Sequence, residues 1–428
     1  MKNRPKLLYA DEAGNILDFP ELEMAGSSGG QWRRMQPGDW IPLPQGSELF
    51  LLPSRLPVGY DSRAKNFQVL SEDPDHRGRK VQAVAAFMAP AHTQIYSAAY
   101  QTLPDAPLLP LFSYSAVGWL NDRFVVAGVR VDADERQDLR HFNPKIIERN
   151  ARRRMQKEGR NRLVQHLGKC AVTYGCPAAR NLFMKRWEAP LPTSPVCNAG
   201  CLGCISLQDR EDLCATQDRI TFVPSPEEVC GVAVPHLREA PRAVVSFGQG
   251  CEGEPLLQAE TLARSIRMMR ECTPRGTINL NTNGSLPLRV KELCDAGLNS
   301  IRVSMNSAQQ NFYQAYFNPR GYTFEDIKLS LKTVKNFGRF ASINYFVLPG
   351  FTDSPPEFEA LCGFIQETQL DLIQMRNLNI DPEWYRAHLR IPPPEKTIGI
   401  RQLMRRLNER FPELKFGYFN PCLDETLV

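Results

Sequence analysis

Apolar and polar residues alternate in short runs over the first third of the chain. The runs SELFLLP, KVQAVAAFM and DRFVVAGVRVD are rich in apolar and β-branched residues, and Pro, Gly and Asp separate them. Short apolar runs between turn-forming residues are typical of strands. The pattern therefore predicts a β-rich N-terminal domain over residues 1–142.

The pattern becomes helical and strongly basic after this domain. The segment IIERNARRRMQKEGRNRLVQHLGK has many more basic than acidic residues, and a run of this kind usually forms a helix that faces water. We expect a basic helical connector over residues 143–184. An anionic partner such as RNA is the alternative, and seven basic residues would contact it: Arg149, Arg152, Arg153, Arg154, Lys157, Arg160 and Arg162.

A different rhythm begins near residue 185, where helical segments separate apolar runs. The apolar runs that predict strands lie at 243–248, 277–282, 300–305, 342–348 and 370–376. Alternating strands and helices imply parallel pairing with right-handed crossovers, hence a doubly wound sheet or a barrel. We expect this α/β domain over residues 185–385 and a C-terminal extension over residues 386–428.

Three helix boundaries can be located from the sequence. Ser225 and Ser354 each precede a Pro and are followed three residues later by Glu, which predicts helix starts, and Gly297 predicts a helix end. Ligands of such α/β folds bind at the carboxyl ends of the strands. The predicted strand ends are polar or rich in Gly and Pro, so we expect the site there.

The composition is that of an ordinary globular protein. The chain has 428 residues, 42% hydrophobic and 23% charged, and its net charge of +5 is too small to indicate a nucleic-acid partner by itself. The sequence begins without a recognisable signal peptide, and no apolar run approaches the roughly 18 residues that span a membrane. We therefore expect a cytoplasmic protein without a membrane partner. Its twelve cysteines would then be reduced.

Three of these cysteines lie within eight residues of one another, in the segment PLPTSPVCNAGCLGCIS. Cys197, Cys201 and Cys204 can converge on one metal centre if the glycine-containing loop wraps around it. Structural zinc needs four ligands, and the six histidines are scattered along the chain. Three thiolates suit an iron–sulfur cluster with one open iron, whereas three core thiols at this spacing would be a rare coincidence.

At these residues the chain resembles the radical S-adenosylmethionine (SAM) enzymes. Cys-x3-Cys-x2-Cys after the first strand of a partial (β/α)6 barrel is the signature of that superfamily. Gly253-Glu254-Pro255 resembles its Gly-Glu-Pro stretch, and Thr282-Asn283-Gly284 resembles the turn that ends its third strand. The resemblance implies a partial (β/α)6 barrel, a 4Fe–4S cluster held by the triplet, and Glu254 on the amino group of SAM.

Weaker matches follow at the ends of the later strands. The resemblance places Ser304 and Asn306 near the ribose, and Gly350 and Asn377 near adenine and ribose. Two features depart from the family pattern. Gly203 stands before the third cysteine, where an aromatic residue is common. The loop GQGCEGEP is longer than usual, so Glu252 competes with Glu254 for the amino-group contact.

The resemblance also implies an activity. Reductive cleavage of SAM would give a 5′-deoxyadenosyl radical that modifies a peptide, a cofactor precursor or a small metabolite. The electron would come from a donor such as flavodoxin or ferredoxin. An RNA-modifying radical SAM enzyme and an iron–sulfur electron carrier or scaffold are the alternatives, and the Gly-Glu-Pro match argues against the carrier.

A second iron–sulfur cluster is also possible, with Cys170 and Cys176 as its first ligands. They lie in KCAVTYGCPAARNLF, with turn-forming residues around the second cysteine. Further ligands would come from Cys214 and Cys422, which lie outside the expected helices. The other candidates sit in helical segments, where a small buried thiol is the ordinary interpretation: Cys230, Cys272, Cys294 and Cys362.

Overall fold

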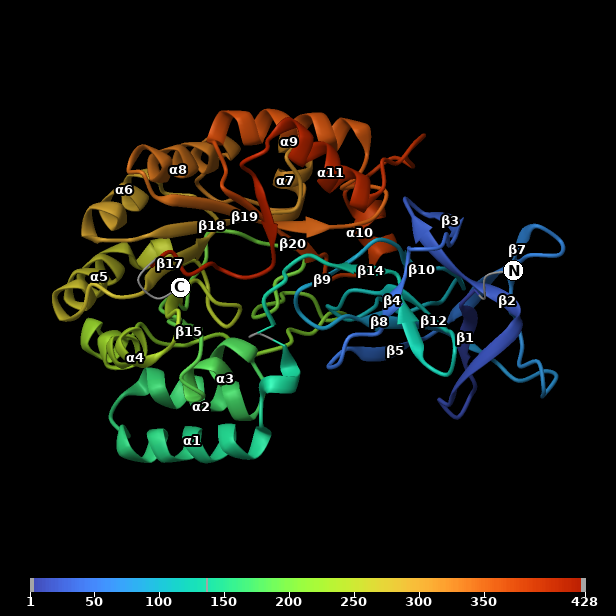
Figure 1. The fold of residues 1–428 in the computed structure, drawn as a ribbon, viewed down its shortest axis with the longest axis horizontal. Helices are drawn as coiled ribbons and strands as arrows, with labels where there is room; N and C mark the ends of the chain where they lie inside the picture. The colour runs from blue at the N-terminus through green and yellow to red at the C-terminus, as the bar shows by residue number, and fades with distance from the viewer. Residues whose placement is uncertain (1–3, 136–137, 425–428) are drawn as a thin grey trace.

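The computed structural model describes residues 4–135 and 138–424 of the chain. Two bodies lie side by side in it (Figure 1): a β-rich N-terminal body and an α/β body that holds the C-terminus. Three helices connect them along one edge of the α/β body. The mixed architecture confirms the predicted fold class, a partial barrel preceded by a β-rich region.

The N-terminal body is built on one large antiparallel sheet, whose main path runs β11-β6-β2-β1-β8-β12-β13-β4. Its strands are β1 (Lys6–Ala10), β2 (Ile16–Ser28), β3 (Gln31–Arg34), β4 (Ile41–Pro42), β5 (Glu48–Leu52), β6 (Arg55–Asp61), β7 (Asn66–Val69), β8 (Gln82–Phe87), β10 (Ser97–Ala98), β11 (Tyr100–Thr102), β12 (Ser115–Trp119) and β13 (Phe124–Val126). A separate antiparallel pair is formed by β9 (His92–Gln94) and β14 (Gly128–Arg130). A short 3-10 helix, η2 (Leu139–His141), follows.

The α/β body contains a seven-stranded parallel sheet in sequence order. Its strands are β15 (Glu188–Pro190), β16 (Val244–Phe247), β17 (Thr277–Thr282), β18 (Ser300–Met305), β19 (Phe340–Val347), β20 (Leu372–Asn377) and β21 (Lys415–Gly417). The five predicted strands are confirmed to within two residues at each end. The sheet continues beyond residue 385, because β21 pairs with β20 in parallel.

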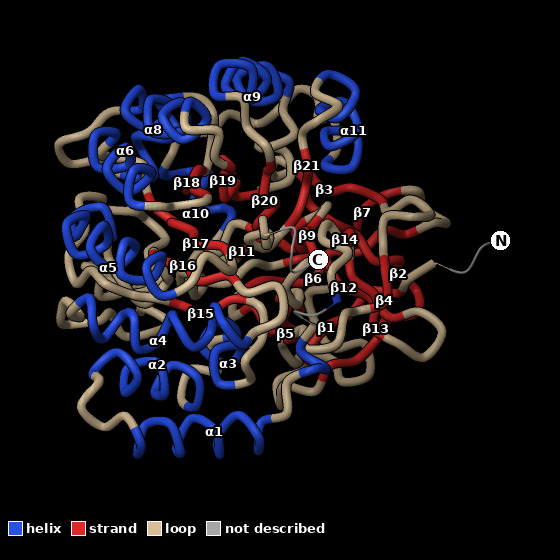
Figure 2. The backbone as a smooth tube through the Cα atoms, turned by 60° about the vertical axis from the view of Figure 1, so that its left-hand side comes forward, coloured by secondary structure: helices blue, strands red, loops and turns tan. Residues whose placement is uncertain are grey.

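Helices cover the outer side of this sheet (Figure 2). They are α4 (Pro226–Glu239), α5 (Ala259–Cys272), α6 (Pro287–Ala296), α8 (Phe324–Asn336), α9 (Pro355–Thr368) and α11 (Ile400–Arg410). The helix α7 (Gln310–Phe317) and the 3-10 helix η3 (Pro255–Gln258) lie at the carboxyl ends of the strands, and α10 (Pro382–His388) faces the N-terminal body. The predicted boundaries are confirmed. Ser225 forms a reciprocal capping box with Glu228, Ser354 accepts from the Glu357 amide, and Gly297 ends α6 with φ 114°.

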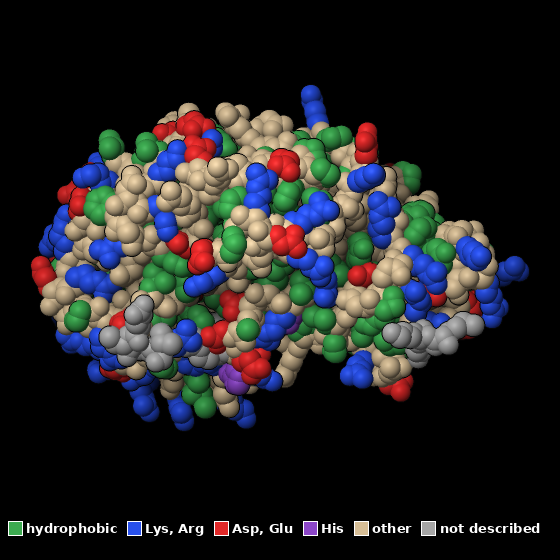
Figure 3. All heavy atoms as spheres, turned by 45° about the horizontal axis from the view of Figure 1, so that its top comes forward, with side chains coloured by type: hydrophobic (Ala, Val, Ile, Leu, Met, Phe, Trp, Pro, Cys, Tyr) green, Lys and Arg blue, Asp and Glu red, His purple; other side chains and the backbone are tan. Residues whose placement is uncertain are grey.

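The basic connector consists of α1 (Pro144–Lys157), α2 (Arg162–Val172) and α3 (Pro177–Phe183), and α2 packs against α4. Some of its basic residues are neutralised within the protein. Arg152 pairs with Glu148, and Arg154 pairs with Glu158. Arg162 pairs with Glu228 of α4. On the face drawn in Figure 3, Lys and Arg side chains are interspersed with Asp and Glu rather than gathered in one patch.

The N-terminal body is docked onto the carboxyl ends of β19 and β20 through buried polar contacts. Asn377 accepts a hydrogen bond from the Gln94 amide at 2.8 Å and donates one to His92 O at 3.1 Å. A fully buried ion pair joins Arg55 Nη2 to Asp381 Oδ2 at 2.7 Å. Because one partner of each contact comes from each body, the two bodies share a specific interface.

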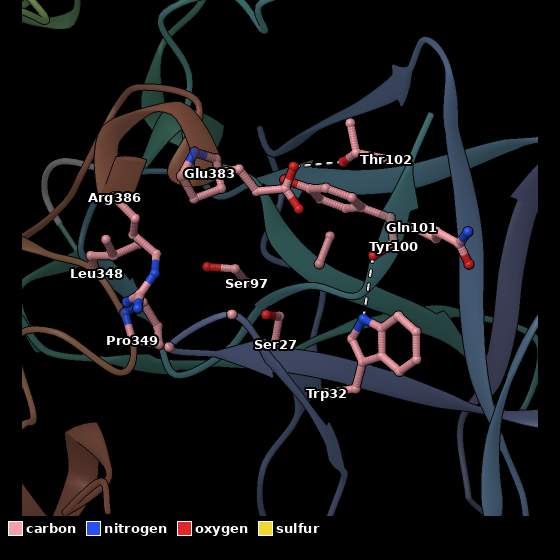
Figure 4. Close-up of a pocket in the computed structure, with 14 residues that line it drawn as sticks. Ser27, Trp32, Ser97, Tyr100, Gln101, Thr102, Leu348, Pro349, Glu383 and Arg386 are labelled. Atoms are coloured by element: carbon pink, nitrogen blue, oxygen red, sulfur yellow. Dashed lines mark hydrogen bonds between the residues drawn. The ribbon is translucent and has the colours of Figure 1, made fainter. Parts of the chain in front are cut away.

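A cavity with about 850 Å³ of empty space, part of which is open to solvent, remains between the two bodies next to this interface. Figure 4 shows its lining, with Glu383 and Arg386 of α10 facing Trp32 and Tyr100 of the N-terminal sheet. Glu383 accepts a hydrogen bond from Thr102 Oγ1 at 2.6 Å. This cavity does not include the cysteine triplet.

Among residues 4–135 and 138–424, no helix has the length and apolar character required to cross a membrane.

Candidate active site

The largest of three cavities described for the protein lies at the carboxyl ends of the barrel strands, as predicted. It holds about 1550 Å³ of empty space, part of which is open to solvent, and the cysteine triplet lines it. The other sequence-predicted residues that line it are Gly253, Glu254, Asn283, Ser304 and Asn377. The structure therefore brings most of the predicted site together.

The cysteine loop is held by backbone contacts to the end of α7. The Gly200 amide donates to Phe317 O at 2.9 Å, and the Leu202 amide donates to Tyr316 O at 3.0 Å. Beyond the helix, the Arg320 amide donates to Asn198 O at 2.9 Å. These bonds fix the loop that carries all three thiols.

The Gly-Glu-Pro loop lies directly against the cysteine loop. The Gly253 amide donates to Ser194 O at 2.6 Å, and the Glu254 amide donates to Val196 O at 2.8 Å. A Cβ on residue 253 would lie 2.0 Å from Val196 O, so only glycine permits this approach. The requirement for Gly253 is therefore steric.

Glu254 is buried and faces the turn after β17. Its carboxylate accepts hydrogen bonds from the Leu256 amide at 3.0 Å, from the Asn283 amide at 2.8 Å and from the Thr282 hydroxyl. Burial raises the pKa of Glu254 to about 7, although these hydrogen bonds oppose the shift. The Glu254 side chain therefore lies in the cavity wall, and its carboxyl group changes protonation state near neutral pH.

Glu252 has a different environment. Its carboxylate accepts four backbone hydrogen bonds of 2.7–3.0 Å, from the amides of Thr193, Ser194, Gly248 and Gln249. Burial raises the pKa of Glu252 to about 7 as well. Because its oxygens are occupied by two loops, Glu252 fastens the end of β15 to the end of β16.

The thiols of the triplet have unequal surroundings. Burial, with the charge of Glu254, raises the pKa of Cys197 to about 11, and burial raises the pKa of Cys201 well above its usual value. Arg219 donates a hydrogen bond from Nη2 to Cys204 Sγ at 3.4 Å. The sequence analysis missed Arg219, because it lies outside every motif.

Gly203 has a structural explanation. A Cβ at this position would lie 2.8 Å from the hydroxyl of Tyr316. Tyr316 and Phe346 line the same cavity, and their rings meet edge to face with centroids 5.7 Å apart. The aromatic lining next to the third cysteine therefore comes from α7 and β19 instead of the cysteine loop.

Two predicted residues lie outside the lining of this cavity. Asn306 is buried and donates to Phe312 O and to the Tyr385 hydroxyl. Gly350 lies against the backbone of Gly29 in the N-terminal body. Asn377 does line the cavity, but both ends of its amide are engaged with that body.

Two arginines enter the same cavity from the barrel strands. Arg302 of β18 donates to Gln374 Oε1 at 2.9 Å, and Arg376 of β20 lies over the ring of Tyr418 at 3.9 Å. Within the described residues neither forms an ion pair, and the Nε atoms of both are buried without a hydrogen-bond partner. Burial and the charge of Arg376 lower the pKa of Arg302 to about 9. The cavity thus contains unpaired positive charge, which the sequence analysis did not anticipate.

The four cysteines considered for a second cluster are not all brought together. Cys170 and Cys176 are neighbours, since the Cys176 amide donates to Cys170 O at 3.0 Å. Cys214 is exposed, and Cys422 packs at the start of β16, with Sγ 3.9 Å from Ala243 O. A second cluster held by all four cysteines stays a prediction, and the positions of Cys214 and Cys422 do not support it.

The sequence itself matches a known family. Residues 191–362 match the family described as the Radical SAM superfamily. This segment is a radical SAM domain. The matched range contains the triplet and Glu254, and similarity to this family implies a 4Fe–4S cluster and SAM. The donor set fits that cluster, because three soft thiols face one cavity.

Several solved structures are similar to the chain. They include native anSMEcpe with bound AdoMet (18% identity, 45% of this chain, 52% of that chain, TM-score 0.36). A radical SAM methyltransferase from Sphaerobacter thermophilus is also similar (16% identity, 55% of this chain, 67% of that chain, TM-score 0.39). So is SuiB of Streptococcus suis bound to S-adenosylmethionine (15% identity, 74% of this chain, 72% of that chain, TM-score 0.39). The chain spans about half the length of the first of these. No curated protein sequence matches the chain.

Proposed function

We propose that this protein is a radical SAM enzyme that cleaves SAM reductively and modifies a peptide, a cofactor precursor or a small metabolite. The observation that carries the proposal is the position of three thiols and one buried carboxylate on a single cavity in a radical SAM domain. When bound by Cys197, Cys201 and Cys204, the cluster supplies the electron that breaks a carbon–sulfur bond of SAM. The electron donor is proposed to be a flavodoxin or a ferredoxin.

The residues around the triplet orient the cofactor. Glu254 accepts a hydrogen bond from the methionine ammonium group, and Gly253 lets its loop approach the cysteine loop. Asn283 and Ser304 supply polar contacts from neighbouring strand ends. Tyr316 supplies an aromatic wall that limits access of water.

The other predicted residues act at a distance in this proposal. Asn306, Gly350 and Asn377 shape the strand ends, because the two amides are already hydrogen bonded and Gly350 contacts the N-terminal body. The N-terminal body then closes one side of the barrel next to β20. We propose that this closure keeps the radical away from solvent.

The substrate is proposed to carry an anionic group, a carboxylate or a phosphate. Arg302 and Arg376 are half-buried like charges that line one cavity, and neither forms an ion pair among the described residues. Cations that are partly buried without an acidic partner destabilise a protein unless a ligand neutralises them. A planar guanidinium fork also matches carboxylate and phosphate oxygens.

The test is anaerobic incubation of the reduced, iron-reconstituted protein with SAM, followed by chromatography for 5′-deoxyadenosine. The wild-type protein should form it, and a variant with Cys197, Cys201 and Cys204 all changed to Ala should form none. Changing the exposed Cys272 to Ser is the matched control and should leave the yield unchanged. Product from the triple variant would refute the assignment of the triplet.

A further inference from the structure

A second group of metal-binding side chains lies outside the cavity of the triplet. His166 and Cys170 are one helical turn apart on α2, and Cys251 lies in the loop after β16. Their ligand atoms all lie within 4.8 Å of one another. Gly250 and Glu252 line the cavity of the triplet, whereas Cys251 between them does not and is buried. Its side chain therefore belongs to a separate site.

The spacing of these atoms matches the ligands of a single ion. His166 Nε2 and Cys170 Sγ are 3.6 Å apart. A tetrahedral zinc ion with Zn–N of about 2.1 Å and Zn–S of about 2.3 Å places bound nitrogen and sulfur about 3.6 Å apart. Thiolates that bind different irons of a cluster must stand further apart than this. Among the described residues this group alone is so compact, and the triplet is spaced more widely.

Cys176 is the candidate for a fourth ligand, although its sulfur lies outside the compact group of three. Its backbone amide is hydrogen bonded to Cys170 O, and its side chain makes no capping bond at the start of α3. Three thiolates and one imidazole form a common ligand set of structural zinc.

We propose that His166, Cys170 and Cys251, completed by Cys176, bind a structural zinc ion. Imidazole and thiolate together favour zinc over the hard cations, which prefer oxygen. The ion would join α2 of the connector to the loop that carries Glu252 and Glu254. It thereby positions the Gly-Glu-Pro loop without touching SAM, and it is independent of the proposed function.

The test is metal analysis of the full-length protein purified without oxygen from medium containing zinc and iron. The host is the variant with Cys197, Cys201 and Cys204 all changed to Ala, so that cluster iron is absent. About one zinc per chain should remain. Adding Cys170→Ser and Cys251→Ser should remove it, whereas adding Cys272→Ser should not. Because zinc content is measured in a variant that lacks the cluster ligands, the result does not depend on whether the wild-type protein cleaves SAM.

Several results would overturn the proposal. About four irons per chain and no zinc in that host would indicate a second iron–sulfur cluster instead. A Cys170–Cys251 disulfide found by mass spectrometry, with no zinc, would indicate a thiol pair. If the serine variants fail to fold, cobalt(II) is titrated into the triple-alanine host. A tetrahedral spectrum with a thiolate charge-transfer band supports the site, and an octahedral spectrum overturns it.

Discussion

Asn283 donates a hydrogen bond from Nδ2 to Asn198 Oδ1 at 2.7 Å, which joins the turn after β17 to the cysteine loop. Asn198 in turn donates to Ser285 Oγ at 3.0 Å. The same turn supplies the Asn283 amide to Glu254 at 2.8 Å. One turn therefore holds both the cysteine loop and the Glu254 carboxylate, although the thiols and the carboxylate come from different loops.

Changing Asn198 to Ala should loosen this arrangement. The Asn283 amide would lose its acceptor, which should lower the free energy of unfolding by about 1–3 kcal/mol. Iron content after reconstitution and the yield of 5′-deoxyadenosine should fall as well. The control is Asn198→Asp, which keeps the acceptor for Asn283 and can accept a hydrogen bond from the Ser285 hydroxyl, so its effect should be smaller. Wild-type stability and iron content in Asn198→Ala would show that the contact is not needed.

Glu252 and Glu254 should respond differently to replacement by Gln. Both oxygens of Glu252 accept backbone amides, so Gln must place its NH2 group against two of them. Glu252→Gln should therefore lower the free energy of unfolding by about 1–3 kcal/mol more than Glu254→Gln, which leaves fewer donors unpaired.

Affinity for SAM should change in the opposite order. Glu254→Gln removes a charge-assisted hydrogen bond to the ammonium group and should weaken binding by about 1.5–3 kcal/mol, roughly tenfold or more. Calorimetric titration of the reconstituted variants with SAM measures this, and urea unfolding measures stability. If Glu252→Gln weakens binding while Glu254→Gln does not, the family motif is shifted by two residues.

Those parts of the fold that depend on local pattern were predictable. Strands β16 to β20 are mostly buried and carry closely spaced apolar residues, which mark them as strands, and the Ser225 and Gly297 caps depend on a few adjacent residues. The triplet was predictable for the same reason. In contrast, β21 has only three residues and no apolar run.

The parts that depend on distant partners were not predictable. Asn377 follows a strand as a ligand-binding residue would, but its amide is engaged by Gln94 of the N-terminal body. His166 and Cys170 have helical i, i+4 spacing, which the sequence displays, but only the fold brings Cys251 to them. Arg302 and Arg376 interrupt apolar strands, and nothing local says that both enter one cavity.

Replacing these arginines tests the anionic substrate. Arg376→Met removes one of two unpaired like charges and should raise the free energy of unfolding of the ligand-free protein by about 1–3 kcal/mol. In a thermal-shift assay, inorganic phosphate, sulfate, dicarboxylates and SAM should each raise the melting temperature of the wild-type protein. The response to phosphate or dicarboxylate should be lost in Arg302→Met and Arg376→Met, with the response to SAM retained. Loss of the SAM response alone would show that the pair binds the cofactor's own carboxylate.

The contact between the connector and the barrel should depend on pH. Glu228 of α4 receives the guanidinium of Arg162 at 2.7 Å, which lowers the pKa of Glu228 to about 2. A lowered pKa in the folded state means that the stabilisation is complete above the unfolded value of 4.5 and is lost as the pH falls toward 2. Since Arg162 is half exposed, solvent screens the pair, and its contribution should be only about 1 kcal/mol.

Glu228→Gln isolates this contribution, because Gln at the third helical position can still complete the capping box with Ser225. The variant should unfold more easily than the wild-type protein in urea near neutral pH, and the difference should shrink steadily below about pH 4.5. Glu227→Gln is the matched control, since the pair of Glu227 with Arg264 is exposed on both sides and should contribute little at any pH. A difference between Glu228→Gln and wild type that stays constant down to about pH 3 would mean that packing, and not the ion pair, holds α2 against α4.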